Sequence, residues 1–219
     1  MPLAVVFAPC APILVPEVAS GAAHELDGVR EVLDAAMSEA LGAGPALVWV
    51  LAPGGRTGRH DPQGRGSFAG FGEPLTAGGK GGPLPATLSV GAWLLDRAGW
   101  TGERAYTTVS AGGTGLPEAP ENAVVLALGD GPATLTDKAP GSRHPAAQAY
   151  DDAIAAALGS GEPARLATMD ATTGVQTMAA GGPVWRAVGG LLTGRFTVSR
   201  QVRQMPYGVG YHVALWRPR

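Results

Sequence analysis

A strand–helix–strand unit in the first 51 residues constrains the fold more than any other feature. The apolar run LAVVFA at residues 3–8 is short and unbroken, which predicts a central strand covered on both faces. Residues 18–41 predict a helix, since apolar residues recur there at three- and four-residue steps: Leu26, Val29, Leu33, Met37 and Leu41. A second buried strand is predicted at 46–51. This unit is long enough for a right-handed crossover between parallel strands.

The rest of the chain continues the alternation of strands and helices. Strands are predicted at 104–109, 122–131, 195–202 and 208–216, and helices at 90–99, 144–159, 162–169, 172–180 and 184–192. The glycine-rich stretch 53–84 predicts a long excursion over the strand ends. We therefore expect one α/β domain over 1–219: a three-layer sandwich with a central twisted mixed or parallel sheet and helices on both faces. Functional sites are then expected where the first, second and 122–131 strands end.

Composition excludes several classes of protein. A hydrophobic fraction of 45% and a charged fraction of 16% indicate a compact globule rather than a disordered chain. The net charge of -2 predicts no nucleic-acid partner. No apolar run reaches the roughly 18 residues of a membrane span. A single cysteine and a start without a basic region predict a cytoplasmic protein with no signal peptide.

The charges are unevenly distributed along the chain. The last acidic residue is Asp170, and six arginines follow it: Arg186, Arg195, Arg200, Arg203, Arg217 and Arg219. One interpretation is a basic wall that faces an anionic ligand. The other, which we favour, is that this segment packs beside the acidic helix near the N-terminus.

The only cysteine, Cys10, lies between prolines in APCAPILVPEV, directly after the first predicted strand. A thiol nucleophile there would need a nearby base, and His60 would supply one if its loop folded back. A small buried thiol is the simpler interpretation. The four histidines are far apart in the sequence and lack zinc-ligand spacing, so each is expected to be a surface or packing residue.

Two glycine-rich stretches, SAGGTGLP at 110–117 and ALGDGPATLTDK at 127–138, suggest phosphate loops at first sight. Neither has the spacing of a Walker motif or of a G-x-G-x-x-G turn that opens a helix. We therefore predict no phosphate site at either stretch.

An ordered series of segments resembles the LigB-type family, the catalytic subunits of class III extradiol ring-cleaving dioxygenases, which also includes Memo-like proteins. PCAPILVPEV is similar to the family's opening PHPPLLVPEV, and VWVLAPGG lies where the family has a strand ending in Ser-Pro-His. LALGDGPATLTDKAPG followed by AYDDAIAAAL resembles the family's ASGDLSH loop and the helix after it. MPYGVGYHVAL resembles the closing PFGVGY strand. The resemblance runs from Val5 to about Leu215 and implies the LigB fold.

The family holds a non-haem Fe(II) with two histidines and a glutamate, and a further histidine serves as acid and base. Carried onto this sequence, the first ligand falls on Cys10, the second on Gly54, the acid/base histidine on Ala133 and the glutamate on Gly181 or Gly182. Glycine and alanine offer no side-chain ligand, and one thiolate does not hold Fe(II) against water. The resemblance thus implies a degenerate metal site with no metal, no cofactor and no catalytic residue.

These patterns predict a non-catalytic protein that binds a small aromatic or anionic molecule or another protein, with a homodimer as the default assembly. Five residues are candidates for lining a pocket: Cys10, Pro12, His60, Asp130 and Tyr207. A first alternative is a metal-dependent oxidoreductase that uses Cys10, His60 and Asp130 as a substitute ligand set for Fe(II) or another divalent metal. A second alternative is a purely structural partner subunit.

Overall fold

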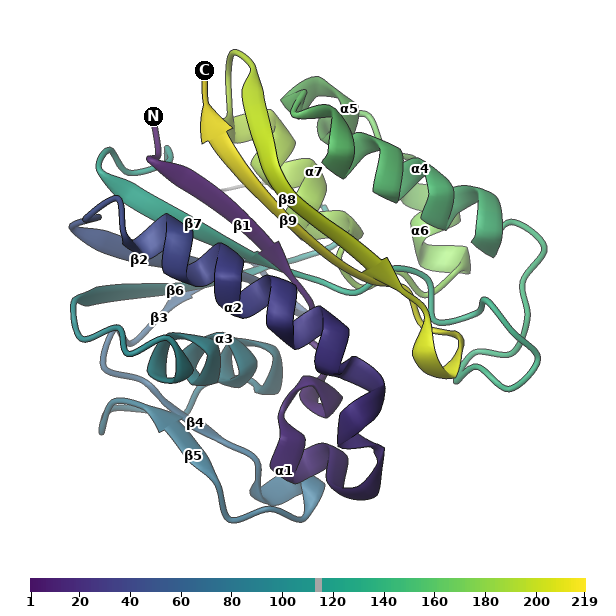
Figure 1. Ribbon diagram of the computed structural model, residues 1–219, viewed down its shortest axis with the longest axis horizontal. Helices are drawn as coiled ribbons and strands as arrows, with labels where there is room; N and C mark the ends of the chain where they lie inside the picture. The colour runs from purple at the N-terminus through teal and green to yellow at the C-terminus, as the bar shows by residue number, and fades with distance from the viewer. Residues whose placement is uncertain (113–115) are drawn as a thin grey trace.

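A computed structural model of the chain describes residues 1–112 and 116–219 (Figure 1). Its main sheet has seven strands in the order β3-β6-β2-β7-β1-β9-β8. The strands are β1 (Ala4–Ala8), β2 (Leu47–Pro53), β3 (Gly58–His60), β6 (Glu103–Val109), β7 (Ala123–Leu128), β8 (Phe196–Gln204) and β9 (Tyr211–Pro218). The four central strands β6, β2, β7 and β1 are mutually parallel, whereas β3, β9 and β8 join antiparallel to their neighbours.

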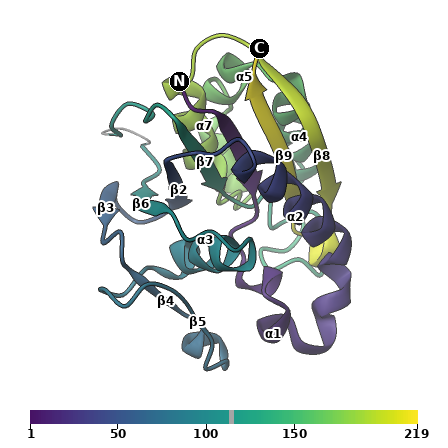
Figure 2. The ribbon, with the colours of Figure 1, turned by 60° about the vertical axis from the view of Figure 1, so that its left-hand side comes forward.

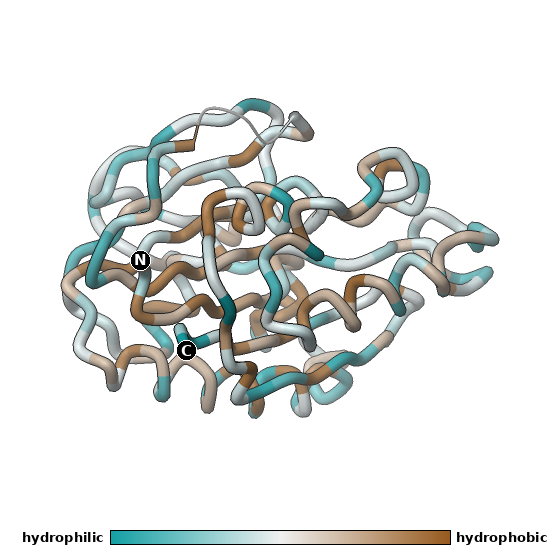
Figure 3. The backbone as a smooth tube through the Cα atoms, turned by 90° about the horizontal axis from the view of Figure 1, so that it is seen from above, coloured by the Kyte–Doolittle hydropathy of each residue, from teal (hydrophilic) through white to brown (hydrophobic). Residues whose placement is uncertain are grey.

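Helices cover both faces of this sheet (Figures 1 and 2). Helices α2 (Asp27–Leu41) and α3 (Ala86–Arg97) pack their apolar sides on one face. Helices α4 (Ala147–Ser160), α5 (Pro163–Ala167) and α7 (Gly182–Leu191) pack on the other, with α6 (Ala171–Gln176) beside α7. The sequence-based prediction of an α/β sandwich with a mixed sheet is therefore confirmed. Hydrophobic stretches run through the interior of the molecule, and hydrophilic colours gather on the outer connections (Figure 3).

The helix predicted at 18–41 is shorter in the structure. The chain forms a short α1 (Pro16–Ala19) and a 3-10 segment η2 (Ser20–Leu26) before α2 begins at Asp27. Ser20 interrupts the helix, because its φ of 49° is in the left-handed region. Arg30 of α2 reaches back and donates to the carbonyl oxygens of Leu14 and Ala23. This buried guanidinium holds the broken segment against α2.

The stretch 53–84 contains more structure than a loop. Besides β3, it forms a two-stranded sheet of β4 (Arg65–Ser67) and β5 (Thr76–Gly78), and a 3-10 turn η3 (Ala69–Phe71) lies between them. Both strands pack against α3 (Figure 2). The excursion therefore extends the α2–α3 side of the molecule.

Most C-terminal arginines pair with acidic residues of other elements. Glu39 of α2 accepts from both Arg200 and Arg217, as expected if this segment packs beside the acidic N-terminal helix. Arg195 pairs with Glu162, and Arg203 pairs with Asp151 and Asp152 of α4. These ion pairs favour the packing interpretation over a basic wall. No helix in the described ranges is long and apolar enough to cross a membrane.

Candidate functional site

Three of the strands expected to frame a site end at one edge of the sheet. Cys10 follows β1, Gly54 follows β2, and Asp130 follows β7, and these three strands run in the same direction. Gly181 directly precedes α7, and its backbone N–H donates to the Asp130 carbonyl oxygen at 2.8 Å. Ala133 lies in the connection after β7 and packs against the core on the α2–α3 side. The four positions that the resemblance singles out therefore all lie at this carboxyl edge.

Cys10 and Asp130 form a closed pair at the ends of β1 and β7. The Cys10 Sγ–H donates to Asp130 Oδ2 at 3.2 Å, and the Cys10 backbone N–H donates to Oδ1 at 3.1 Å. Cys10 is 3% exposed and Asp130 is 9% exposed. Burial raises the pKa of the Cys10 thiol well above its usual value, and the neighbouring Asp130 raises it further. Burial also raises the pKa of Asp130. In this environment the thiol form is favoured over the thiolate, which makes Cys10 a poor nucleophile.

Tyr211 lies beside this pair, and Tyr207 lies near Tyr211. Tyr211 begins β9, the antiparallel neighbour of β1, and is almost fully buried. Burial raises the pKa of its phenol, and the acidic groups of Asp130 and Cys10 raise it further. Tyr207 contributes to the same shift, yet its side chain is exposed. Of the candidate pocket residues, Cys10 and Asp130 are therefore in contact, while Tyr207 lies at the rim.

The backbone at two of the other positions accepts only glycine as it is folded. A Cβ atom on Gly54 would lie 2.7 Å from the Thr108 Cβ, and a Cβ atom on Gly181 would lie 2.4 Å from the Trp185 ring. Trp185 is fully buried and cannot yield easily. A histidine or glutamate at these positions would need a different local backbone. The absence of ligand side chains is thus built into the packing of this edge.

His60 does not meet the Cys10–Asp130 pair. It lies on β3, and β6, β2 and β7 separate β3 from β1, which puts the strand axes about 19 Å apart. Its Nε2 lies 3.0 Å from the Thr108 hydroxyl, which itself donates to the Gly58 carbonyl oxygen. While that hydroxyl hydrogen is directed at Gly58, the Thr108 oxygen accepts from His60 Nε2–H. Burial lowers the pKa of His60, and nearby Arg56 lowers it further.

On the opposite face of the sheet, the same edge carries a buried charged cluster that the sequence analysis missed. Asp151 of α4 is fully buried and contacts His212 Nε2 at 2.8 Å and Arg203 Nε at 2.6 Å. His212 is 1% exposed, and its Nδ1 has no hydrogen-bond partner. A signal was present in the sequence. Asp151 falls within the apolar stripe of α4: Ala147, Tyr150, Ile154, Ala157 and Leu158. An acid in such a stripe predicts burial with a cationic partner.

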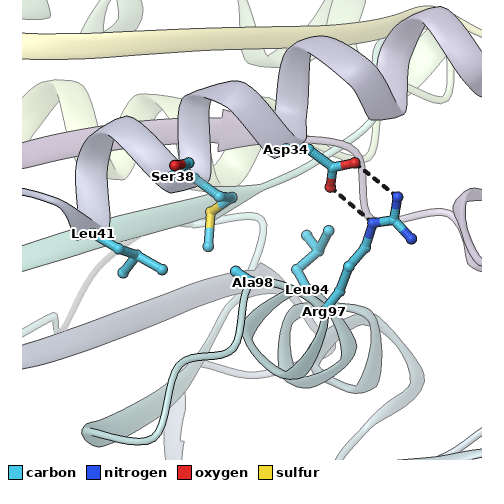
Figure 4. Close-up of a pocket in the computed structure, with 7 residues that line it drawn as sticks. Asp34, Ser38, Leu41, Leu94, Arg97 and Ala98 are labelled. Atoms are coloured by element: carbon cyan, nitrogen blue, oxygen red, sulfur yellow. Dashed lines mark hydrogen bonds and ion pairs between the residues drawn. The ribbon is translucent and has the colours of Figure 1, made fainter.

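A hollow of about 440 Å³ lies between α2 and α3, away from these clusters (Figure 4). Met37, Leu41 and Leu94 provide its apolar surface, and a bidentate Arg97–Asp34 ion pair at 2.7–2.8 Å bridges the two helices at one side. The hollow extends toward Leu41 and Ala98, which end the helices that lead into β2 and β6. It therefore lies toward the amino ends of the strands and not at the Cys10 edge.

Within residues 1–112 and 116–219, no three His, Cys, Asp or Glu side chains are grouped so that they could hold a metal ion. Gly113, Thr114 and Gly115, in the middle of the stretch SAGGTGLP, lie outside the described residues. Searches with protein-family models and against curated proteins find no match to this chain. The resemblance to the LigB-type family therefore stays a prediction from the sequence.

Proposed function

We propose that this chain is a LigB-like protein that has no ring-cleaving activity and acts by binding another molecule. The observation that carries the proposal is the Cys10–Asp130 hydrogen bond at 3.2 Å. It occupies the place that the resemblance assigns to the first metal ligand. Both partners are buried and hydrogen-bonded to one another, so a ligand would have to break this contact to bind either of them.

The residues present do not fit an Fe(II) centre. Such a centre needs neutral imidazoles and a carboxylate that leave open coordination positions. The edge offers one thiol, at Cys10, that is hydrogen-bonded to Asp130, and no side-chain donor at Gly54, Ala133 or Gly181. His60 lies on β3, far from this edge position, and bonds Thr108 of β6. The alternative of a substitute Cys10, His60 and Asp130 set would need a rearrangement across three strands. We therefore derive no catalytic step through a metal.

The decisive experiment is to incubate the protein with Fe(II) under anaerobic conditions, remove free metal, and measure bound iron and dioxygen uptake with catechol and substituted catechols. We expect far less than one iron per chain and no uptake above the buffer rate. Cys10→Ala is the matched variant, and its fold is checked by circular dichroism. Stoichiometric iron that is lost in Cys10→Ala, together with catechol-dependent uptake, would contradict the proposal.

A second measurement separates small-molecule binding from a purely structural role. A thermal-shift screen with small aromatic acids, catechols and inorganic anions should raise the melting temperature for at least one class, because a ligand that binds only the folded state stabilises it. No shift with any compound would favour the structural partner subunit. A cytoplasmic location, in which the lone thiol stays reduced, belongs to the same proposal.

A further inference from the structure

Two polar side chains from different helices face the same point at the N-terminus of α7. This helix begins with Gly182 and Pro183, and no side-chain hydrogen bond caps it within the described residues. The point where a Cβ atom on Gly182 would lie is 3.1 Å from Arg186 Nη1 and 3.7 Å from Tyr150 Oη. Apart from the chain neighbours of Gly182, no other side chain of the described residues comes within 4 Å of that point. We call this space, bounded by Gly182, Arg186 and Tyr150, the α7 site.

The Tyr150 hydroxyl is a buried donor without an acceptor. Tyr150 is 6% exposed, and its Oη has no hydrogen-bond partner. Burial raises the pKa of this phenol, so the hydroxyl keeps its proton. A buried polar group that stays unpaired costs free energy, and such groups are rare in folded proteins. The α7 site therefore presents a hydroxyl that is suited to donate to a ligand.

Arg186 supplies a positive charge to the same space. Most other C-terminal arginines pair with acids, but no ion pair to Arg186 forms in the part of the chain that the structure describes. Its Nη2 donates to the Ala111 carbonyl oxygen at 3.1 Å, while Nη1 faces the α7 site. A guanidinium has five N–H donors, so several remain available. The amino end of a helix also carries a partial positive charge, which adds to that of Arg186.

Asp170 is the acidic residue that acts electrostatically on both side chains. Its carboxylate caps α6 and accepts from the Thr172 N–H at 3.0 Å and the Thr173 N–H at 3.2 Å. Hydrogen bonds from Thr173 and Thr172 lower the pKa of Asp170, and Arg186 lowers it further. The Asp170 oxygens are thus engaged by α6. What the α7 site lacks is a negatively charged acceptor for its own donors.

We propose that the α7 site binds the anionic oxygens of a small molecule, either a carboxylate or a phosphate group. These oxygens would accept charge-assisted hydrogen bonds from Arg186 and a hydrogen bond from Tyr150, next to the positive end of α7. The inference rests on the proposed function, in which the chain acts by binding, and it adds the place and the chemical class of the ligand. The α7 site lies on the α4–α7 face and does not involve the Cys10–Asp130 pair.

Isothermal titration calorimetry with inorganic phosphate and, separately, with benzoate tests the inference at low ionic strength, because salt screens such contacts. We expect the wild type to bind at least one of the two with a Kd of about 1 mM or lower. Binding of phosphate alone would identify a phosphate group, and binding of benzoate alone a carboxylate. Arg186→Ala should weaken binding about tenfold or more, since it removes the charge.

Tyr150→Phe separates a ligand-binding role of the hydroxyl from a structural one. It should weaken binding severalfold, yet leave the melting temperature equal to or above that of the wild type, because the hydroxyl has no partner within the described chain. Gly182→Ala should weaken binding about tenfold or more, since its Cβ atom occupies the α7 site. Gly190→Ala is the matched control on the same helix, because a Cβ atom there meets nothing within 4 Å, and it should bind like the wild type.

Two results would overturn the inference. One is a folded wild type that binds neither phosphate nor benzoate at about 10 mM, well above the expected Kd. The other is binding that none of Arg186→Ala, Tyr150→Phe and Gly182→Ala weakens. In both cases the iron and dioxygen measurements still test the proposed function separately. Thermal stabilisation by a different compound class would then support binding at another place.

Discussion

Two buried carboxyl groups at the same edge of the sheet are held in opposite ways. On the α2–α3 face, Asp130 is paired with a neutral thiol, and burial raises its pKa. On the α4–α7 face, Asp151 lies between the Arg203 guanidinium and the His212 ring. The first arrangement tolerates a protonated acid, whereas the second supplies a cation to a fully buried side chain. Burial alone therefore does not determine how a carboxyl group affects stability. The effect depends on whether its hydrogen-bond partner is neutral or carries a positive charge.

The two carboxyl groups also differ in the role that we assign to them, although both lie at the same edge of the sheet. A carboxylate beside a cation is a structural clamp between α4 and β9. A carboxyl group beside the Cys10 thiol fills the position where the LigB-type resemblance would place chemistry. The comparison thus predicts that the two sites respond differently to substitution and to pH.

The largest effect is expected from Asp151→Ala. Removal of this side chain leaves His212 Nε2 without its hydrogen-bond partner and the buried side of Arg203 without a counter-charge, which should lower the free energy of unfolding by about 3–5 kcal/mol. Urea unfolding of the wild type and of the variant measures this change in the free energy of unfolding. Asp152→Ala is the control, because Asp152 also accepts from Arg203 but its side chain is 57% exposed, and it should cost less than about 1 kcal/mol. Equal losses for both variants would refute the clamp.

A smaller effect is expected at Cys10. Cys10→Ala leaves Asp130 Oδ2 buried without a donor and should cost about 1–3 kcal/mol. Cys10→Ser retains a donor at the same position and should cost less than the alanine variant. The two unfolding curves give the comparison directly. If serine destabilised as much as alanine, the Cys10–Asp130 hydrogen bond would not be what holds this edge together.

The smallest effect is a pH dependence that belongs to Asp130. Because its pKa in the folded state is above the usual 3.8, the folded chain binds more protons than the unfolded chain between these two values. The Asp130 contribution to stability is therefore greatest at low pH and is lost as the pH rises through this window, with a slope of at most about 1.4 kcal/mol per pH unit. Asp130→Asn, which does not titrate, should lack this loss. A wild-type advantage that grew with pH would contradict the raised pKa.

Local patterns were enough to predict most of the fold. Each predicted strand forms, because an unbroken apolar run such as VVLAL at 124–128 has few ways to be buried other than in a central strand. The break at Ser20 was missed, since it depends on a left-handed residue and on Arg30 reaching back to distant carbonyl oxygens. Local periodicity contains no information about such tertiary contacts.

The site was only partly predictable for the same reason. The sequence placed Cys10 and Asp130 at the ends of two predicted strands, and the structure brings them into contact. It did not determine the strand order, which sets His60 at the far side of β6, β2 and β7. His212 was treated as an isolated histidine, because its partner Asp151 lies 61 positions earlier. Pairings between elements follow from the sheet order and not from spacing along the chain.

The central claim, that the Cys10 edge is closed, is tested most directly by the labelling rate of the protein's only thiol with a disulfide reagent. We predict that native protein at pH 8 reacts about a hundredfold or more slowly than the chain unfolded in urea, because the thiol is buried, protonated and bonded to Asp130. Labelling should accelerate only as denaturant unfolds the protein. Native labelling as fast as that of the unfolded chain, with a pH midpoint below the usual 9.0, would contradict the account.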